Sequence, residues 1–420
     1  MSGSKPSVTV NGRDYNWPAA PLVVICCDGS EPEYMDVAVA QGLMPNLERI
    51  LGKGENLLGA SVVPSFTNPN NLSIVTGRPP AVHGICGNYL IDPDTGQEVM
   101  MNDPKFLRAP TIFEGFQKAG ARVVVVTAKD KLRLLLGNGL TFGHDGAVSF
   151  SSEKADQCAL ETHGIENVCE MVGMGVPDVY SAELSEFVFA AGVKLLASHR
   201  PDLMYLSTTD YVQHKYAPGS DGANAFYTMM DGYLGALDEA GAIIVLTADH
   251  GMKDKHLADG SPDVLYLQDV LDEWLGEGES TVILPITDPY VVHHGALGSF
   301  ATVYLNDAAE AGALASRIGA LEGIHASHTK AEGCALYELP EDRMGDLIIV
   351  SRDTKVLGTT AAKHDLSGLN EPLRSHGGIT EQTIPIIANR KLVGLPENLR
   401  NFDAFSIGCN HVAGMAQAAE

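Results

Sequence analysis

The stretch that decides the fold class is IIVLTADHG, at residues 243–251. Its first five residues are apolar or β-branched and do not alternate with polar ones, which is typical of a strand buried on both faces of a parallel sheet. Asp249 and His250 follow where that strand should end. In open α/β sheets, ligands bind at the carboxyl ends of the strands, so this pair indicates a site. The alternative is a loop aspartate that caps the next helix.

Other apolar runs have the same character and also precede polar residues. They are Leu22–Cys27, Val123–Thr127 and Leu203–Ser207. Helical patterns lie between the runs, over Met44–Leu51, Pro110–Ala119, Ala182–Ser198 and Ala223–Ala240. Strands that alternate with helices predict an α/β fold with a mostly parallel central sheet flanked by helices.

The pattern changes after about residue 256 and predicts an inserted α+β cap with few site-like residues. Its expected elements are a strand over Ser299–Leu305, a helix over Asp307–Leu321, and strands over Ala335–Leu339 and Asp346–Ser351. Another strand is expected at Thr383–Ala388. We therefore expect residues 1–255 to form the first part of a core, residues 256–359 the cap, and residues 360–420 the completion of the core.

Composition limits the partners. With 420 residues, 45% of them hydrophobic, the chain can bury a large core. A net charge of −25 argues against nucleic acid or an anionic membrane as partner, and no apolar run approaches the roughly 18 residues of a membrane span. The seven cysteines form no C-x-x-C pair, and the N-terminus lacks an apolar signal sequence, so we expect a cytoplasmic protein. Composition leaves open whether the chain forms a homo-oligomer.

Metal-ligand residues recur after the predicted strands. Asp28 follows the first run, while Asp210 and His214 follow the third with the i, i+4 spacing that places two side chains on one helix face. His376 lies in a late Ser-His-Gly-Gly segment. Taken alone, each of these residues is also typical of an ordinary surface or loop position. Together with Asp249 and His250, however, they form an ordered set of three carboxylates and three imidazoles. Mixed His and Asp ligation favours Zn²⁺, with Mn²⁺ and Fe²⁺ as alternatives.

A hydroxyl suited to nucleophilic attack lies in PSFTNPNNLSIVTGRPP, at residues 64–80. This segment predicts a loop that enters a short helix ending at Gly77. Thr67 then lies at the helix N-terminus, where backbone N–H groups favour anions. Zinc lowers the pKa of bound water from 15.7 to about 7, and a bound alcohol should respond similarly. The alternatives are that Thr67 is only a helix cap, or that Ser65 is the nucleophile.

With these residues in view, the chain resembles the alkaline phosphatase superfamily, and most closely its nucleotide pyrophosphatase/phosphodiesterase-like branch. The matching text is Val24–Gly29, Met44–Leu47, Phe66–Gly77, His83-Gly84, Asn88, Asp210–His214, Asp249–Met252 and His376–Gly378. The resemblance covers about three quarters of the chain. It implies an alkaline phosphatase-like core and a covalent phospho-threonine intermediate.

The resemblance also implies roles for the site residues. One zinc would be bound by Asp28, Asp249 and His250 and would bind and activate Thr67. The other would be bound by Asp210, His214 and His376 and would ready the hydrolytic water. Asn88 matches the position where this branch places an amide on a phosphoryl oxygen. His293-His294 lies outside this order and is interpreted as a feature of the cap or rim.

The resemblance also implies a substrate, phosphonoacetate, and the segment that carries this part of the resemblance is TAKDKLR, at residues 127–133. Lys129 and Lys131 are two residues apart, so in an extended backbone they point the same way. Cleavage of a C–P bond releases a carbanion, and in phosphonoacetate that charge can move into the carboxylate, where two ammonium groups would stabilise it. The expected reaction is hydrolysis of this small anionic phosphonate to acetate and phosphate. A solvated basic loop is the structural alternative.

Rival functions remain at this point. A phosphodiesterase or nucleotide pyrophosphatase of the same branch would need an aromatic slot for a base, and the sequence does not identify one. A non-catalytic binding protein that keeps metals for stability belongs to another class. The presence of both a hydroxyl and a full ligand set argues against it.

Overall fold

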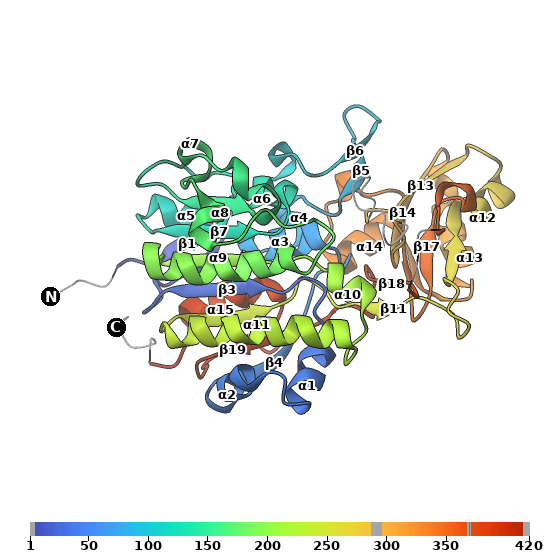
Figure 1. Cartoon of the computed structure of the whole chain (residues 1–420). Helices are drawn as coiled ribbons and strands as arrows, with labels where there is room; N and C mark the ends of the chain where they lie inside the picture. The colour runs from blue at the N-terminus through green and yellow to red at the C-terminus, as the bar shows by residue number, and fades with distance from the viewer. Residues whose placement is uncertain (1–4, 287–295, 368, 370, 415–420) are drawn as a thin grey trace.

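The computed structural model describes residues 5–286, 296–367, 369 and 371–414. Its larger part is built around a seven-stranded sheet with the strand order β4-β19-β10-β3-β9-β7-β8 (Figure 1). In that order the strands are Glu55–Ala60, Thr383–Ala388, Ile243–Thr247, Leu22–Cys26, Leu203–Ser207, Val123–Thr127 and Val148–Ser151. Strands β10, β3, β9, β7 and β8 run parallel, whereas β19 is antiparallel to both its neighbours. The predicted α/β class with a mostly parallel sheet is confirmed.

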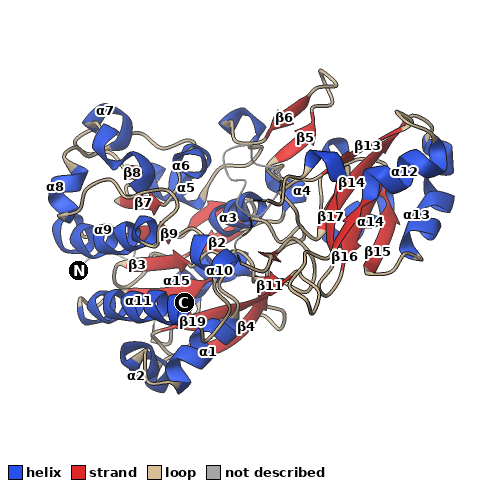
Figure 2. Cartoon of the chain, turned by 45° about the vertical axis from the view of Figure 1, so that its right-hand side comes forward, coloured by secondary structure: helices blue, strands red, loops and turns tan. Residues whose placement is uncertain are grey.

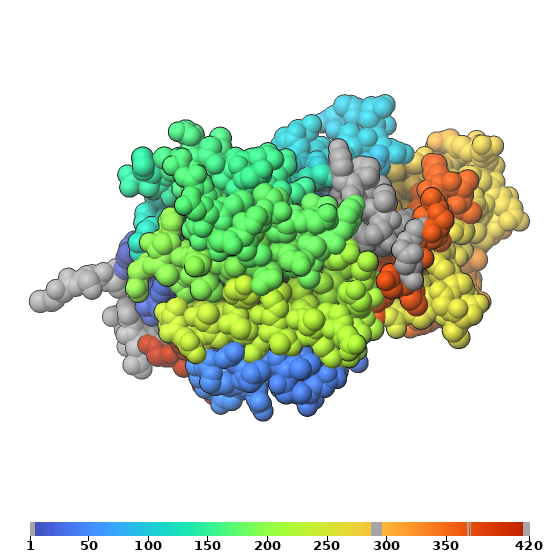
Figure 3. Space-filling model, viewed as in Figure 1, coloured from blue at the N-terminus to red at the C-terminus, as the bar shows by residue number. Residues whose placement is uncertain are grey.

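Helices cover both faces of this sheet (Figure 2). One face carries α1 (Pro32–Ala40), α2 (Pro45–Lys53), α8 (Val168–Val172), α9 (Glu183–His199) and α11 (Asp221–Glu239). The other carries α3 (Thr67–Thr76), α5 (Ile112–Lys118), α6 (Asp130–Leu136) and α15 (Ala404–Asn410). Successive strand residues point to opposite faces, so Val123 and Val125 enter one core cluster and Val124 and Val126 the other. Figure 3 shows α9 and α11 side by side over the first of these faces.

A second, four-stranded antiparallel sheet lies beside the first (Figure 1). Its order is β13 (Ser280–Ile283), β14 (Phe300–Leu305), β16 (Leu347–Ser351) and β15 (Ile324–Thr329). The helices α12 (Leu267–Leu275), α13 (Ala311–Gly319) and α14 (Lys330–Tyr337) pack against its strands. The expected strands near residues 300–305 and 346–351 and the expected helix near residues 307–321 are present.

One predicted element of this region is wrong. The expected strand over Ala335–Leu339 is instead the end of α14 and the residues that follow it. The helix begins at a capping box, in which Thr329 and Glu332 satisfy each other's backbone N–H groups, and this local signal outweighs the apolar residues that suggested a strand. The strand β15 was not predicted, because most of its residues are half-buried and give no apolar run.

Short sheets join the two parts. Strand β11 (Lys253–Asp254) pairs with β18 (Arg374–Ser375), where the chain leaves the core and returns to it. This pairing supports the proposed start of the cap near residue 256, and the limits 256–359 stay a proposal. Over the described residues, the remaining elements of at least three residues are β1 (Val8–Val10), β2 (Arg13–Tyr15), α4 (Pro80–His83), β5 (Tyr89–Ile91), β6 (Glu98–Met100), α7 (Leu160–His163), α10 (Tyr211–Lys215), β12 (Val264–Tyr266), β17 (Val356–Gly358) and six 3₁₀ turns.

Candidate active site

The polar residues after three adjacent strands converge at one edge of the central sheet. Asp28 follows β3, Asp210 is the N-cap residue of α10 after β9, and Asp249 follows β10. The parallel register Cys26↔Ser207 and Cys26↔Thr247 brings these strand ends level with one another. The arrangement follows from parallel pairing, because strands that run the same way end at the same edge.

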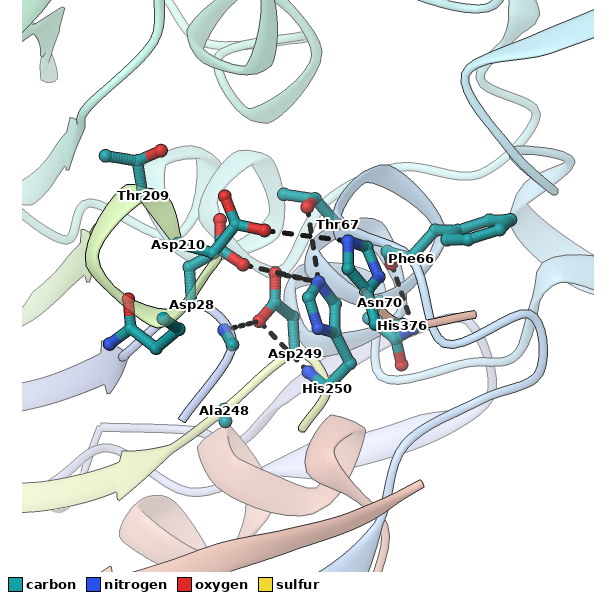
Figure 4. Close-up of polar contacts among 12 residues, drawn as sticks. Asp28, Phe66, Thr67, Asn70, Thr209, Asp210, Ala248, Asp249, His250 and His376 are labelled. Atoms are coloured by element: carbon teal, nitrogen blue, oxygen red, sulfur yellow. Dashed lines mark hydrogen bonds and ion pairs between the residues drawn. The ribbon is translucent and has the colours of Figure 1, made fainter. Parts of the chain in front are cut away.

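Two groups of ligand-type side chains form there, and all of their members are buried. One group consists of Asp28, Asp249 and His250, and the other of Asp210, His214 and His376. These are the two sets that the resemblance implies. In the first, His250 Nε2 lies 3.3 Å from Asp28 Oδ1 and 3.8 Å from Asp249 Oδ2. In the second, Asp210 Oδ2 lies 3.0 Å from His214 Nε2. The same oxygen lies 3.5 Å from His376 Nε2 (Figure 4).

Backbone carbonyls fix the orientation of all three imidazoles. The Nδ1 atoms of His214, His250 and His376 lie 2.8, 2.8 and 2.7 Å from the carbonyl oxygens of Arg374, Gly251 and Ser65. Because a carbonyl oxygen only accepts, each Nδ1 carries the proton and donates it, and each Nε2 faces the carboxylates. A histidine that binds a metal through one ring nitrogen usually donates a hydrogen bond from the other, as these Nδ1 atoms do.

The electrostatics of the site favour a bound cation. Burial raises the pKa of Asp28 well above its usual range, and the charges of Asp210 and Asp249 add to the rise. Burial likewise raises the pKa of Asp249. Burial and the neighbouring His250 lower the pKa of His376 well below its usual value, so its Nε2 presents a lone pair to the Asp210 carboxylate. Acceptors that face acceptors in a buried site need a positive charge between them, so the residues fit divalent cations.

Thr67 lies directly beside these groups. It is the first residue of α3, and its Oγ1 is 3.4 Å from His250 Nε2 (Figure 4). The helix ends at Gly77, whose φ of 67° is the left-handed conformation that glycine adopts at helix ends, as the sequence predicted. Ser65, the rival hydroxyl, is fully buried and donates its proton to the Gly378 carbonyl at 2.8 Å. Ser65 is therefore engaged in packing the loop that carries His376.

A cavity opens beside Thr67. Its lining residues are Asp28, Thr67, Asn68, Asn88, Met100, Asn102, Thr127, Lys129, Lys131, Leu132, Thr208, Thr209 and Asp210. Asn88, Lys129 and Lys131 thus face the same space as Thr67. Met100 and Asn102 belong to the end of the β5–β6 hairpin and the turn after it, and no sequence motif indicated that they would line the site.

The predicted geometry of the lysine pair is wrong, although both lysines line the cavity. Lys129 has an extended backbone, with φ −110° and ψ 138°, but Lys131 already lies in the first turn of α6. The two side chains therefore reach the cavity from a strand-to-helix turn and not from an extended segment. Lys129 is close enough to Asp28 to oppose the rise that burial causes in the pKa of that carboxyl.

One supporting residue was missed from the sequence. Asn71 donates from Nδ2 to Asp249 Oδ2 and to the Thr67 carbonyl, both at 3.1 Å. Its Oδ1 accepts from Tyr205 at 2.7 Å and Ser207 at 2.9 Å. Asn71 thus ties the nucleophile helix to a proposed ligand. The i, i+4 spacing from Thr67 places both on one helix face and was the available signal. His293-His294 lies outside the described residues.

Comparison with known proteins places this site in a family. Residues 22–379 match the family model of type I phosphodiesterases/nucleotide pyrophosphatases. The chain belongs to this family. It is thereby also a member of the alkaline phosphatase superfamily, as the resemblance implied.

Several relatives of this family member are known. A phosphonoacetate hydrolase from Sinorhizobium meliloti, solved with phosphonoacetate and with phosphonoformate, is 63% identical and has a TM-score of 0.94, over 97% of this chain and 99% of that chain. A murine ectonucleotide pyrophosphatase/phosphodiesterase 5, an inactive variant in complex with AMP, has the same fold at 18% identity and a TM-score of 0.63, over 92% and 93% of the two chains. A Schizosaccharomyces pombe pyrophosphatase/phosphodiesterase is 34% identical over 93 residues, 21% of this chain and 18% of that protein.

Proposed function

We propose that this chain hydrolyses the C–P bond of phosphonoacetate and releases acetate and phosphate. The observation that carries the proposal is that Lys129 and Lys131 line the same cavity as Thr67 and the buried acidic ligands. A phosphoryl-transfer site and a binding site for a carboxylate are thereby joined in one small space. The 63% identity with the Sinorhizobium meliloti phosphonoacetate hydrolase, over nearly the whole chain, supports the same substrate.

The two buried groups would hold two zinc ions, with Mn²⁺ or Fe²⁺ as alternatives. Asp28, Asp249 and His250 would hold one, next to Thr67, and the set of Asp210, His214 and His376 would hold the other. When bound, such cations neutralise phosphoryl charge and make a hydroxyl or a water nucleophilic at neutral pH. Burial raises the pKa of Asp28 and of Asp249, so a bound cation would stabilise the ionised form of these two carboxylates.

In the first step, Thr67 Oγ1 attacks phosphorus. An O–P bond forms, the C–P bond breaks, and the hydroxyl proton passes to solvent water, which gives a phospho-threonine. Thr67 is the first residue of a ten-residue helix, so the N-terminal dipole of α3 favours the phosphoryl charge. We assign the Asn88 amide, which lines the cavity, to a phosphoryl oxygen.

The role of the lysines is to stabilise the charge of the leaving group. The electron pair of the broken C–P bond stays on the methylene carbon and is delocalised into the carboxylate as an enediolate. Lys129 and Lys131 would stabilise that charge as it develops. A proton taken up at carbon then gives acetate. A water molecule next attacks the phosphorus of the phospho-threonine from the side opposite Thr67, which breaks the O–P bond, restores the hydroxyl and releases phosphate.

A phosphodiesterase or nucleotide pyrophosphatase is the second candidate function. The family match and the AMP-bound murine structure of the same fold favour it. The cavity does not, because none of the described residues that line it is aromatic, so this described lining offers a base no ring to stack on. A non-catalytic, metal-stabilised binding protein is the third candidate.

A phosphate-release assay over a small panel separates these candidates. The zinc-loaded protein is incubated with phosphonoacetate, a nitrophenyl monoester, bis-nitrophenyl phosphate and ATP. The proposal expects phosphate from phosphonoacetate at a kcat/KM at least tenfold above the others. Preference for the diester or ATP would support the second candidate, and no turnover of any substrate by the zinc-loaded protein would support the third.

We also propose a compartment and an assembly state for this protein. Among the described residues, no helix combines the length and the apolarity needed to cross a bilayer. All seven cysteines are unpaired, which supports the cytoplasm as the compartment. A homo-oligomer remains a prediction, and light scattering of the purified protein tests it.

A further inference from the structure

One buried hydroxyl that lines the cavity has no role in the chemistry above. Thr127 is the last residue of β7, is fully buried, and contributes to the cavity wall together with Lys129 and Lys131. Within the described part of the chain, no atom forms a hydrogen bond with its Oγ1. A buried hydroxyl that lacks a partner typically costs about 1–3 kcal/mol, so its position at a cavity wall indicates a partner from outside the chain.

Neighbouring strand-end hydroxyls provide a contrast. Ser207, which pairs with Thr127 in the β7–β9 register, donates to Asn71 at 2.9 Å. Thr208 Oγ1 accepts from the Asp28 backbone N–H at 2.9 Å. These hydroxyls stabilise the loops that carry ligands. Thr127 lies one strand further along the sheet and is not used in that way.

The topology decides which part of a ligand Thr127 would meet. The acidic ligands follow β10, β3 and β9, which are consecutive in the sheet, and β7 is the next strand after β9. The end of β7 is therefore on the side of the cavity away from Asp249 and on the side of the lysines. A phosphoryl group held beside Thr67 and the ligand groups would direct the rest of the substrate toward this side.

We infer that Thr127 Oγ1 donates a hydrogen bond to the carboxylate of bound phosphonoacetate, as a third donor beside Lys129 and Lys131. This inference rests on the proposed function and names a specificity-determining residue for it. The two ammonium groups attract negative charge without strict direction, whereas a hydroxyl fixed at a strand end requires an acceptor at one place. A substrate without that acceptor would leave the hydroxyl unpaired, which is a strong source of discrimination.

Paired substitutions test the inference. Thr127→Val keeps the shape of the side chain and removes the hydroxyl, and Thr127→Ser keeps the hydroxyl. We expect Thr127→Val to raise KM for phosphonoacetate about tenfold or more, the effect of one hydrogen bond to a charged group. Thr127→Ser should stay within about threefold of the parent. The inhibition constant of inorganic phosphate, which has no carboxylate, should change less than twofold in both.

A matched control comes from the adjacent strand. Ser149 on β8 is also buried, and its hydroxyl too lacks a hydrogen bond from the described residues, but it does not line the cavity. Ser149→Ala should leave KM unchanged. If Thr127→Val has the KM of the parent protein, or raises KM and the phosphate constant equally, the inference is wrong.

A negative result with the Thr127 variants can be distinguished from a failure of the proposed function. If the parent protein does not hydrolyse phosphonoacetate, the proposed function fails before any variant is compared. If the parent is active and only the Thr127 result is negative, the proposed function stands without this contact. Should Thr127→Val fail to fold, as judged by circular dichroism, Thr127→Ala is measured against the same two criteria.

Discussion

The imidazole rings of His250 and His376 stack face to face, with centroids 3.7 Å apart and an angle of 7° between their planes. His250 belongs to one proposed metal group and His376 to the other, so this contact joins the two groups. The loops that carry them are far apart in the chain. Their backbone carbonyl partners, Gly251 and Ser65, hold the rings in this arrangement.

Thr67→Ala should abolish turnover. The variant removes the only atom that could form the phospho-threonine, so we expect kcat on phosphonoacetate to fall by about 10³-fold or more. Thr67→Ser, which retains a hydroxyl at the start of α3, should keep measurable activity. Mass spectrometry of acid-quenched protein should show a phosphorylated Thr67 only in the parent. Full turnover by Thr67→Ala would contradict the assignment of the nucleophile.

Chelation should remove both activity and stability. Without cations the buried carboxylates of Asp28 and Asp249 are left beside each other, so we expect a lower melting temperature as well as loss of phosphate release. Added Zn²⁺ should restore both, and metal analysis should give two ions per chain. Undiminished activity in a protein shown to be free of metal would refute this prediction, and restoration by Mn²⁺ or Fe²⁺ alone would correct the metal.

Lys129→Ala and Lys131→Ala should damage C–P cleavage selectively. We expect kcat/KM for phosphonoacetate to fall about a hundredfold, because the enediolate loses a charge-assisted partner. Turnover of a nitrophenyl monoester should change less than threefold. Lys154→Ala is the control, since that side chain is half exposed and paired with Asp130 at 3.4 Å outside the cavity lining. Equal losses on both substrates would show that the lysines serve the phosphoryl group or the fold.

Asn71→Ala should weaken metal binding through its effect on Asp249. The variant removes the 3.1 Å hydrogen bonds to the Asp249 carboxylate and to the Thr67 carbonyl. Partners of this kind typically contribute about 10- to 100-fold in metal affinity or activity. Zinc affinity, measured by competition with a chelator, should fall accordingly. Ser207→Ala removes only one donor to Asn71 and should have a smaller effect. An unchanged zinc affinity in Asn71→Ala would contradict a positioning role.

Asp238 should make stability depend on pH far from the active site. Its carboxylate accepts hydrogen bonds from Arg49 at 2.6 Å and Lys53 at 2.8 Å. Burial opposes ionisation of Asp238, but these bonds, with one from Asn389, lower its pKa from 3.8 to about 2. Because the folded pKa is below the unfolded one, the stabilisation is complete above pH 3.8 and is lost as the pH falls toward 2.

The isosteric Asp238→Asn variant tests the predicted direction of this pH dependence of stability. Urea unfolding at pH 7 should show the variant to be less stable by about 1–3 kcal/mol, since Arg49, Lys53 and Arg390 lose their anionic partner. The difference between variant and parent should shrink as the pH is lowered below 3.8. A difference that grows with acidification would show that the interpretation of this carboxylate is wrong.

Much of the core was predictable because its signals are local. The runs that form β3, β7, β9 and β10 are continuously apolar, and the structure places each within one residue of its predicted bounds. These runs form parallel strands, which end at the same edge of the sheet, so the polar residues that follow them lie close together. The strand β15 and the helix α14 were missed or misassigned, because half-buried strands carry weak patterns and a capping box is easily overlooked.

The sequence by itself determined the reaction class: a parallel sheet brings its strand ends together, and the residue types at those ends are ligands for a cation. Only the tertiary structure decided how they are held. Carbonyls from distant segments orient the imidazoles of His214 and His376, and the turn into α6, not an extended strand, carries Lys131 to the cavity. The physical reason is that hydrogen-bond direction and helix onset depend on partners brought together by folding, which residue spacing does not encode.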